Sequence, residues 1–227
     1  MALNKLQKFA ENSLLPNVYE NPNAREPSLI GINGEEVQLK GKWHESHFKN
    51  QNPITLELAC GRGEYTVALG RMYPNRNFIG VDIKGARIWQ GAKMAHTEGL
   101  GNVAFLRTQI ELIAIFFAEN EIDEIWITFP DPFLNENQSN RRLTAPWFLN
   151  KYRLFLKKNG IIHLKTDSPV LFRFTIKTIE NTEGASLLSS DDNIHANPHL
   201  TDELGINTYY ENKNIAKSSI KYIRFTI

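Results

Sequence analysis

Four carboxylates in this 227-residue chain stand at or just after the ends of short apolar segments: Glu57, Asp82, Asp131 and Asp167. A carboxylate accepts hydrogen bonds from ribose hydroxyls and from the N–H groups of a nucleobase, and it attracts positive charge. In an open parallel sheet, ligands bind beyond the carboxyl ends of the strands. If the apolar segments are parallel strands, we expect the four carboxylates to line one crevice.

The first of these acids precedes a glycine-rich loop, Glu57-Leu-Ala-Cys-Gly61-Arg-Gly63, in which glycine lets the backbone approach a ligand closely. A dinucleotide-binding loop would have a third glycine where this chain has Thr66, so a nicotinamide or flavin enzyme is disfavoured. Glu57 would repel a pyrophosphate but attract a cation, and Asp82, 21 residues after Gly61, can accept from both hydroxyls of a ribose. The combination predicts an S-adenosylmethionine site. The alternative is an ordinary strand-to-helix turn with a capping acid.

A second motif follows the apolar segment at residues 122–129. Pro130 and Pro132 fix the backbone φ angle on both sides of Asp131, which predicts a carboxylate held rigidly at the ligand edge of the sheet. A proline-rich loop with a capping Asp is the alternative, but it does not explain an acid between two prolines.

The charge of the chain is unevenly distributed although its net value is only +1. Residues 141–177 contain nine basic side chains and one acidic side chain, whereas residues 178–212 contain seven acidic side chains and no Lys or Arg. Clustered Lys and Arg release counterions from phosphates, so the basic segment indicates a polyanionic partner such as a nucleic acid. A solvated helix face is the alternative interpretation.

Apolar and amphipathic segments alternate along most of the chain. We expect strands at residues 54–58, 77–82, 103–106, 122–129, 161–166 and 219–227, and helices at 64–72, 85–98, 110–119, 143–158 and from about 170. This alternation predicts an α/β fold with a mostly parallel, doubly wound sheet, whose last strand we expect at an edge. Residues 1–52 are expected to form an N-terminal extension with a short helix near residues 3–11, whereas residues 181–207 give no clear pattern.

The ordered motifs together are similar to those of a known family. Leu56-Glu-Leu-Ala-Cys-Gly-Arg-Gly63, Phe78-Ile-Gly-Val-Asp82, Phe129-Pro-Asp-Pro-Phe133, Asn140-Arg-Arg-Leu-Thr144 and Thr166-Asp167 resemble the motifs of the tRNA (guanine-N7-)-methyltransferase family. Thr208-Tyr-Tyr-Glu211 resembles the Thr-x-x-Glu segment that precedes the last strand in that family. The resemblance covers about residues 50–227. It implies a Rossmann-like class I methyltransferase fold with an antiparallel last strand in a domain at 53–227, and methylation of guanine N7 in the variable loop of tRNA.

The resemblance also implies roles for individual residues. Glu57, Gly61, Gly63, Asp82, Gln109 and Asp131 would bind S-adenosylmethionine, Asp131 would be the catalytic residue, and Asn135, Arg141, Arg142, Asp167, Thr208 and Glu211 would bind the substrate. Gln109 stands where the family usually has Asp, but its amide oxygen can still accept a hydrogen bond from an adenine amine. Asn135 stands where a substrate-contacting Lys is usual, Phe133 where Trp is commoner and Ala59 where Gly is commoner.

Guanine N7 has a lone pair and no proton, so no base is needed to create the nucleophile, and we assign Asp131 to positioning and electrostatic stabilisation. One alternative is a nucleic-acid methyltransferase for exocyclic amines, although Asp131-Pro-Phe133 lacks the second proline of its motif. Another is a non-catalytic RNA-binding protein with the same fold.

Other candidate sites are weaker. His44 and His47 could ligate a metal but have no Cys or acid at metal spacing nearby, so we expect no metal site. His163 is expected to be a core residue, and Cys60 a small packed residue. The longest apolar run has seven residues, which is too short to span a membrane, and the N-terminus lacks an apolar signal region. We therefore expect a cytoplasmic protein, and the sequence does not predict its oligomeric state.

Overall fold

The computed structural model describes residues 3–24, 28–199, 201–212 and 219–227. Its helices are α1 (Lys5–Asn12), α2 (Glu64–Met72), α3 (Gly85–Thr97), α4 (Pro146–Tyr152), α5 (Pro169–Glu180) and α6 (Tyr209–Asn212), with short helical turns η1 (Ile32–Gly34), η2 (Trp43–Phe48), η3 (Ile110–Ile115), η4 (Glu136–Arg141) and η5 (Ile194–Ala196). Its strands are β1 (Val18–Glu20), β2 (Leu29–Ile30), β3 (Glu36–Val37), β4 (Ile54–Leu58), β5 (Asn77–Asp82), β6 (Val103–Arg107), β7 (Ile122–Thr128), β8 (Leu156–Thr166), β9 (Ser186–Asp191) and β10 (Lys221–Thr226).

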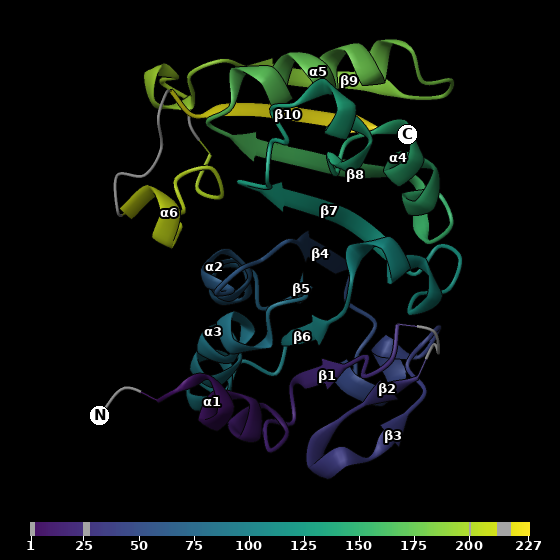
Figure 1. Cartoon of the computed structure of the whole chain (residues 1–227), viewed down its shortest axis with the longest axis vertical. Helices are drawn as coiled ribbons and strands as arrows, with labels where there is room; N and C mark the ends of the chain where they lie inside the picture. The colour runs from purple at the N-terminus through teal and green to yellow at the C-terminus, as the bar shows by residue number, and fades with distance from the viewer. Residues whose placement is uncertain (1–2, 25–27, 200, 213–218) are drawn as a thin grey trace.

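The strands of the described residues form one sheet in the order β3-β2-β1-β6-β5-β4-β7-β8-β10-β9 (Figure 1). The strands from β1 to β8 in this order are parallel, and the pairs at both edges are antiparallel. From β4 the chain adds strands first on one side and then on the other, which makes the gap beyond β4 and β7 a topological switch point. The predicted doubly wound α/β fold with an antiparallel C-terminal strand is confirmed.

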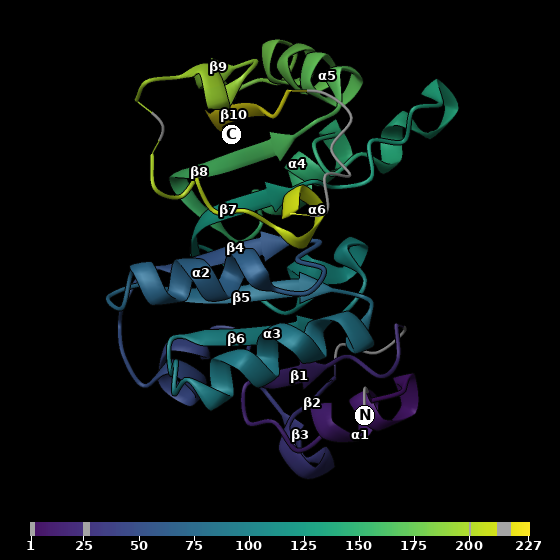
Figure 2. The same ribbon diagram turned by 90° about the vertical axis from the view of Figure 1, so that its left-hand side faces the viewer.

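The sheet is covered on both faces. Helices α2 and α3 lie on one face, and η3, α4 and α5 lie on the other (Figure 2). Successive residues of a strand face opposite sides, so Phe78 of β5 packs in the cluster under α2 and α3, whereas Ile79 packs in the larger cluster on the other face. These two layers of buried side chains fix the strands whose carboxyl ends carry the candidate site.

The segment expected as an N-terminal extension joins this sheet. β1 pairs in parallel with β6, with Val18 opposite Phe105. The predicted short helix is confirmed as α1, which Asn4 caps. It packs against α3, where Trp89 and Lys93 both bond to the carboxylate of Glu11 at 2.8 and 2.7 Å.

Two expected helices differ from the structure. The helix predicted at 143–158 is confirmed only over α4, Pro146–Tyr152, because the chain enters β8 at Leu156, which pairs with Ile122 of β7. The helical spacing of apolar residues continues beyond Tyr152. From Leu156, however, pairing with the edge of β7 overrides this local preference, and the chain forms a strand. The segment predicted as a helix at 110–119 is only the 3-10 helix η3, Ile110–Ile115.

The last strand is not at the edge of the sheet, contrary to the prediction. β10 lies between β8 and β9, and Ile223 is opposite Leu164 on one side and Ser190 on the other. β9 lies within residues 181–207, which show no clear pattern in the sequence. The reason is that β9 is an edge strand with both faces exposed, and such a strand needs no alternation of apolar residues.

Candidate active site

The loop between β4 and α2 forms the floor of the candidate site. Ala59, Gly61 and Gly63 have positive φ angles of 59°, 57° and 73°, a region in which glycine alone is free of strain. A Cβ atom on Gly61 would meet nothing within 4 Å, whereas one on Gly63 would lie 2.4 Å from the ring of Phe105. Gly61 therefore lines an open cavity, and Gly63 lets the loop pack closely on the sheet.

Glu57 lies below this loop and is 3% exposed. Its carboxylate accepts hydrogen bonds from the backbone N–H of Thr66 at 2.8 Å and from the hydroxyl of Thr128 at 2.6 Å. Burial raises the pKa of Glu57 to about 7, although both threonines lower it in part. Because the contacts described for this carboxylate include no Lys or Arg, a cation bound in the cavity would favour its ionised form.

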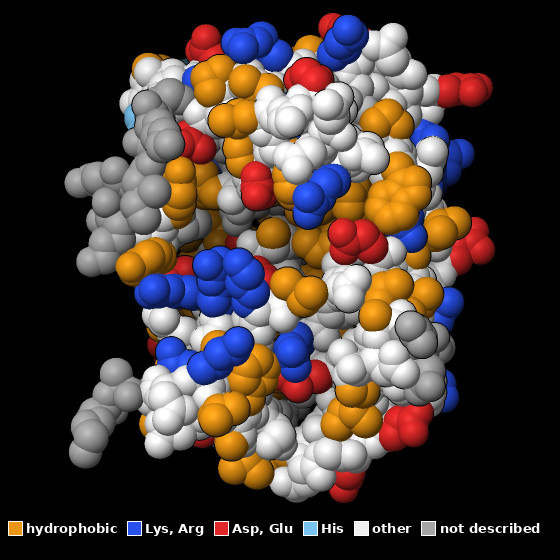
Figure 3. Space-filling model, in the orientation of Figure 1, with side chains coloured by type: hydrophobic (Ala, Val, Ile, Leu, Met, Phe, Trp, Pro, Cys, Tyr) orange, Lys and Arg blue, Asp and Glu red, His pale blue; other side chains and the backbone are white. Residues whose placement is uncertain are grey.

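Two cavities meet at Ala59, at the carboxyl ends of the parallel strands. The first has a volume of about 310 Å³ and is lined by residues that include Glu57, Gly61, Arg62, Phe129, Thr208 and Tyr210. The second, of about 290 Å³, is lined by residues that include Asp82, Gln109, Ile110, Asp131, Phe133 and Arg141. Figure 3 views the molecule from this side, with Lys and Arg side chains gathered beside a hollow near the centre.

Asp82 and Gln109 lie in the second cavity, as the sequence predicts for neighbouring strand ends. The carboxylate of Asp82 accepts from the backbone N–H groups of Gly61 at 3.0 Å and Lys84 at 2.8 Å. The Gln109 side chain is exposed beside the apolar Ile110. A carboxylate, an amide and an apolar wall in one cavity suit a nucleoside, which has hydroxyls, an amine and an apolar ring face.

The loop after β7 carries Asp131 to the same cavity. Phe129 and Phe133 on either side of Pro130-Asp131-Pro132 have positive φ angles of 45° and 41°. Such strained residues persist only when the surrounding structure holds them, and they concentrate at functional sites. The Oδ1 atom of Asp131 accepts from the backbone N–H of Phe133 at 3.0 Å, and the side chain is exposed. Asp131 is thus a fixed carboxylate at a cavity wall.

The two arginines of the Asn140–Thr144 motif have different environments. Arg141 is exposed and lines the second cavity. Arg142, expected at the substrate, is 1% exposed and donates to the carbonyl oxygens of Pro132 and Phe133 at 3.0 and 2.9 Å. The Arg142 guanidinium is therefore held by the loop, and the residue also borders a third cavity, which Arg173 and Lys177 line as well.

The C-terminal segment brings Thr208 to the first cavity, and Glu211 lies next to Thr208. The carboxylate of Glu211 accepts from the backbone N–H and the hydroxyl of Thr208 at 3.0 and 3.1 Å. Tyr210 donates its hydroxyl to Asp167 at 3.3 Å, and burial together with this carboxylate raises the pKa of Tyr210. The late motif and the acid after β8 therefore lie close together.

Lys165 is a residue of this region that the sequence analysis did not assign. It is fully buried in β8, where its Nζ atom donates to the carbonyl oxygens of Leu204 and Ile206 at 3.0 and 2.8 Å and lies 3.0 Å from Glu211. Burial lowers its pKa, and Glu211 raises it in part. The only sequence signal is a lysine within an apolar strand. Lys165 ties the segment that carries Thr208 to the sheet.

The basic segment at 141–177 is not one solvated face. Arg141, Arg153, Lys158, Arg173 and Lys177 are exposed, whereas Arg142 and Lys165 are buried in contacts with the protein. Asn135 is also exposed, and its side chain accepts from the backbone N–H of Asn137 at the start of η4. The segment that connects β7 to α4, which contains η4, projects away from the sheet (Figure 2).

The remaining candidate residues have structural contacts. His44 bonds to the carbonyl oxygen of Asn52 at 2.9 Å, His47 bonds to the hydroxyl of Tyr19 at 2.7 Å, and the described residues contain no group of three potential metal ligands. Cys60 is buried with a pKa well above its ordinary value, since burial disfavours the thiolate, which confirms a packed residue. Among the described helices, none is long and apolar enough to cross a membrane.

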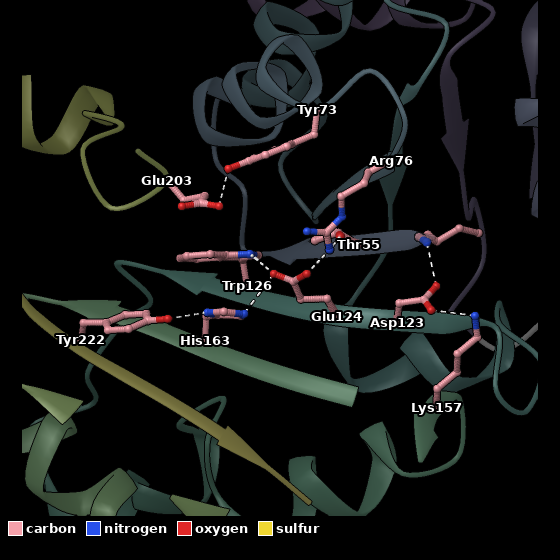
Figure 4. Close-up of polar contacts among 11 residues, drawn as sticks. Thr55, Tyr73, Arg76, Asp123, Glu124, Trp126, Lys157, His163, Glu203 and Tyr222 are labelled. Atoms are coloured by element: carbon pink, nitrogen blue, oxygen red, sulfur yellow. Dashed lines mark hydrogen bonds and ion pairs between the residues drawn. The ribbon is translucent and has the colours of Figure 1, made fainter. Parts of the chain in front are cut away.

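His163 belongs to a buried network centred on Glu124 (Figure 4). Glu124 accepts from Trp126 at 2.8 Å, lies 2.9 Å from His163 Nε2, and pairs with Arg76. His163 also bonds to Tyr222 at 2.7 Å. His163 and Arg76 hold the pKa of Glu124 at about 2 despite its burial. His163 is 6% exposed, which confirms the prediction that it is a core residue.

Three features define a class I methyltransferase fold: the parallel sheet with the antiparallel strand β10, the glycine loop after β4, and the carboxylates at the strand ends. A solved 30S ribosomal A1408 methyltransferase from an uncultured bacterium is similar in structure, with a TM-score of 0.61 at 16% identity over 88% of this chain and 98% of that one. The 16S rRNA methyltransferase KamB is similar as well, with a TM-score of 0.60 at 12% identity over 85% and 96% of the two chains.

Sequence comparison gives the family. Residues 51–222 match the family described as "Putative methyltransferase". The tRNA (guanine-N(7)-)-methyltransferase of Bacteroides fragilis is 49% identical over 100% of this chain and 87% of its own length. That of Porphyromonas gingivalis is 51% identical over 92% and 84%. The chain belongs to the tRNA (guanine-N7-)-methyltransferase family.

Proposed function

We propose that this protein transfers a methyl group from S-adenosylmethionine to N7 of a guanine in tRNA, in the variable loop as in the family it resembles. The observation that carries this proposal is the 49% identity over the full chain to the Bacteroides fragilis tRNA (guanine-N(7)-)-methyltransferase. The adjoining cavities, with Glu57, Asp82 and Asp131 in their walls, are consistent with it.

The residues of the two cavities fit the cofactor. Asp82 would accept hydrogen bonds from the ribose hydroxyls, and Gln109 from the adenine amine. Gly61 leaves room beside the loop, and Glu57 offers a buried carboxylate to a cationic ligand. When bound, S-adenosylmethionine supplies an activated methyl group on a positively charged sulfur.

Asp131 would position the guanine and stabilise the positive charge that develops on its ring. A carboxylate can accept from guanine N1–H and from the 2-amino group, and its charge interacts more strongly as the ring becomes cationic. Because N7 carries no proton, the site needs no general base. Asp167 and Thr208 would contact the same base, together with Glu211 if that carboxylate leaves the Lys165 ion pair.

Arg141 at the second cavity would meet the phosphates of tRNA, together with Arg173 and Lys177, which are exposed and line a third cavity beside α5. Each phosphate that a Lys or Arg neutralises releases counterions, so binding should weaken as salt rises. Since tRNA is the proposed substrate, we place the reaction in the cytoplasm.

The test is incubation of the purified protein with unmodified tRNA and S-adenosylmethionine, followed by nucleoside analysis of the product. We expect 7-methylguanosine, and a tRNA with the variable-loop guanine replaced should remain unmethylated. N6-methyladenosine would point instead to an exocyclic-amine methyltransferase. No methyl transfer at all would support a non-catalytic RNA-binding protein.

A further inference from the structure

Arg141 and Arg142 are adjacent in sequence, but Arg141 is exposed and Arg142 is buried. Arg141 is the last residue of η4, whereas Arg142 leaves this helical turn with extended backbone, φ −63° and ψ 132°. The Arg141 guanidinium lies 4.5 Å from the centre of the Phe133 ring at the exposed cavity wall. Arg142 lies on the inner side, below the loop that carries Asp131.

The described contacts of the Arg142 guanidinium are with the loop that carries Asp131, with η4 and with α5. Its Nε and Nη2 atoms donate to the carbonyl oxygens of Pro132 and Phe133, and its Cζ atom lies 4.5 Å from the centre of the Phe174 ring on α5. Its ion-pair partner Glu136, at 3.1 Å, has a side chain that is 77% exposed. An ion pair between a buried cation and an exposed carboxylate contributes little to the stability of the protein. The planar guanidinium instead bonds two neighbouring carbonyl oxygens at once, which indicates that Arg142 fixes the geometry of the loop.

The loop that carries Asp131 has few hydrogen-bond donors of its own, so its carbonyl oxygens depend on a donor from outside the loop, the Arg142 guanidinium. Pro130 and Pro132 have no backbone N–H, so they cannot donate hydrogen bonds within the loop. Phe133 has one, and it donates to Asp131 Oδ1 at 3.0 Å. The carbonyl oxygen of the same residue accepts from Arg142 at 2.9 Å. A continuous set of hydrogen bonds thus runs from Arg142 through Phe133 to Asp131.

We propose that Arg142 is a positioning residue that holds the Asp131 carboxylate in its reactive orientation, and that it makes no contact with tRNA. In this proposal the Arg142 guanidinium, which bonds to the Phe133 carbonyl and contacts the Phe174 ring, maintains the strained φ of 41° at Phe133. This inference rests on the proposed role of Asp131 in methyl transfer.

The test is a double-mutant cycle of Arg142→Met and Asp131→Ala, measured as single-turnover methylation of tRNA. We expect Arg142→Met alone to lower the single-turnover rate constant by about 100-fold, the effect of misplacing a catalytic group by roughly 1 Å. In the Asp131→Ala background the same substitution should change the rate by less than about 2-fold, because its effect passes through that carboxylate.

Two further measurements separate positioning from other roles. The dependence of tRNA affinity on salt should be unchanged in Arg142→Met but shallower in Arg141→Gln. Arg142→Lys keeps the charge but cannot bond both carbonyls as a planar fork, so we expect a partial loss of kcat with unchanged tRNA KM. This variant also tests the proposal if Arg142→Met does not fold. Arg71→Met, on the exposed side of α2 where Arg71 pairs with Glu98, is the matched control and should keep full activity.

Losses that add in the double variant, or a shallower salt dependence for Arg142→Met, would overturn the positioning role. If Asp131→Ala itself retains activity, the proposed function of Asp131 fails independently of Arg142. If the unaltered protein makes no 7-methylguanosine, the proposed reaction fails.

Discussion

Replacing Glu57 with glutamine removes a buried ionisable group and keeps its shape. The carboxylate is 3% exposed and is held by Thr66 and Thr128. The glutamine oxygen can still accept from the Thr66 N–H, and its amide can donate to the hydroxyl of Thr128. The substitution therefore isolates the effect of the charge.

The sign and size of the effect follow from the pKa of Glu57, which burial raises from 4.5 to about 7. Between these values the folded protein binds more protons than the unfolded chain, so the free energy of unfolding falls as pH rises. The shift corresponds to about 3 kcal/mol in total. The stability of Glu57→Gln relative to the unaltered protein should therefore increase by up to this amount from about pH 4.5 to pH 8.

Cofactor binding should show the opposite dependence on pH. A cationic methionine end in the Glu57 cavity favours the ionised carboxylate, so affinity for S-adenosylmethionine should rise toward pH 7, by up to about tenfold per unit below the pKa. Glu57→Gln should lack this rise, because an amide does not ionise in this pH range. The titration of the ligand itself is the same for both proteins and cancels in the comparison. Adenosine, which lacks the charged end, is the control ligand.

Urea unfolding and calorimetric titration between about pH 5 and pH 8.5 measure both effects. Equal pH dependence of stability in the two proteins would show that Glu57 titrates normally. Equal pH dependence of S-adenosylmethionine affinity would remove Glu57 from the cofactor site.

Three other substitutions test the site. Asp131→Asn should lower kcat by about 100-fold or more with cofactor affinity unchanged, because an amide cannot stabilise a cationic purine; near-normal kcat would make Asp131 a loop cap. Arg141→Gln should weaken tRNA binding and reduce the slope of log K against log salt by about 1, and an unchanged slope would remove Arg141 from the interface. Lys165→Met should lower the free energy of unfolding by about 3–5 kcal/mol, because it leaves the Glu211 carboxylate buried without its cation; adding Glu211→Gln should recover part of this in urea titrations, and no recovery would refute the pairing.

Much of the fold could be predicted because its signals are local. α2 and β5 begin and end at the predicted residues, Glu64–Met72 and Asn77–Asp82. Apolar alternation together with glycine and proline sets such boundaries within a few residues of chain. The acids at strand ends could also be placed at one edge, because parallel strands bring their carboxyl ends together.

The sequence alone therefore determined the parallel core, the glycine loop and the acids around it. Contacts between distant segments place β10 between β8 and β9, pair β1 with β6 and end α4 at Tyr152, so the local pattern does not predict these features. Such contacts also bury Arg142 while Arg141 stays exposed, and they pair Lys165 with Glu211, 46 residues away. Adjacent arginines have the same intrinsic preferences. Their environments differ because burial and hydrogen-bond partners come from segments distant in the chain, here the Asp131 loop, α5 and the segment before β10.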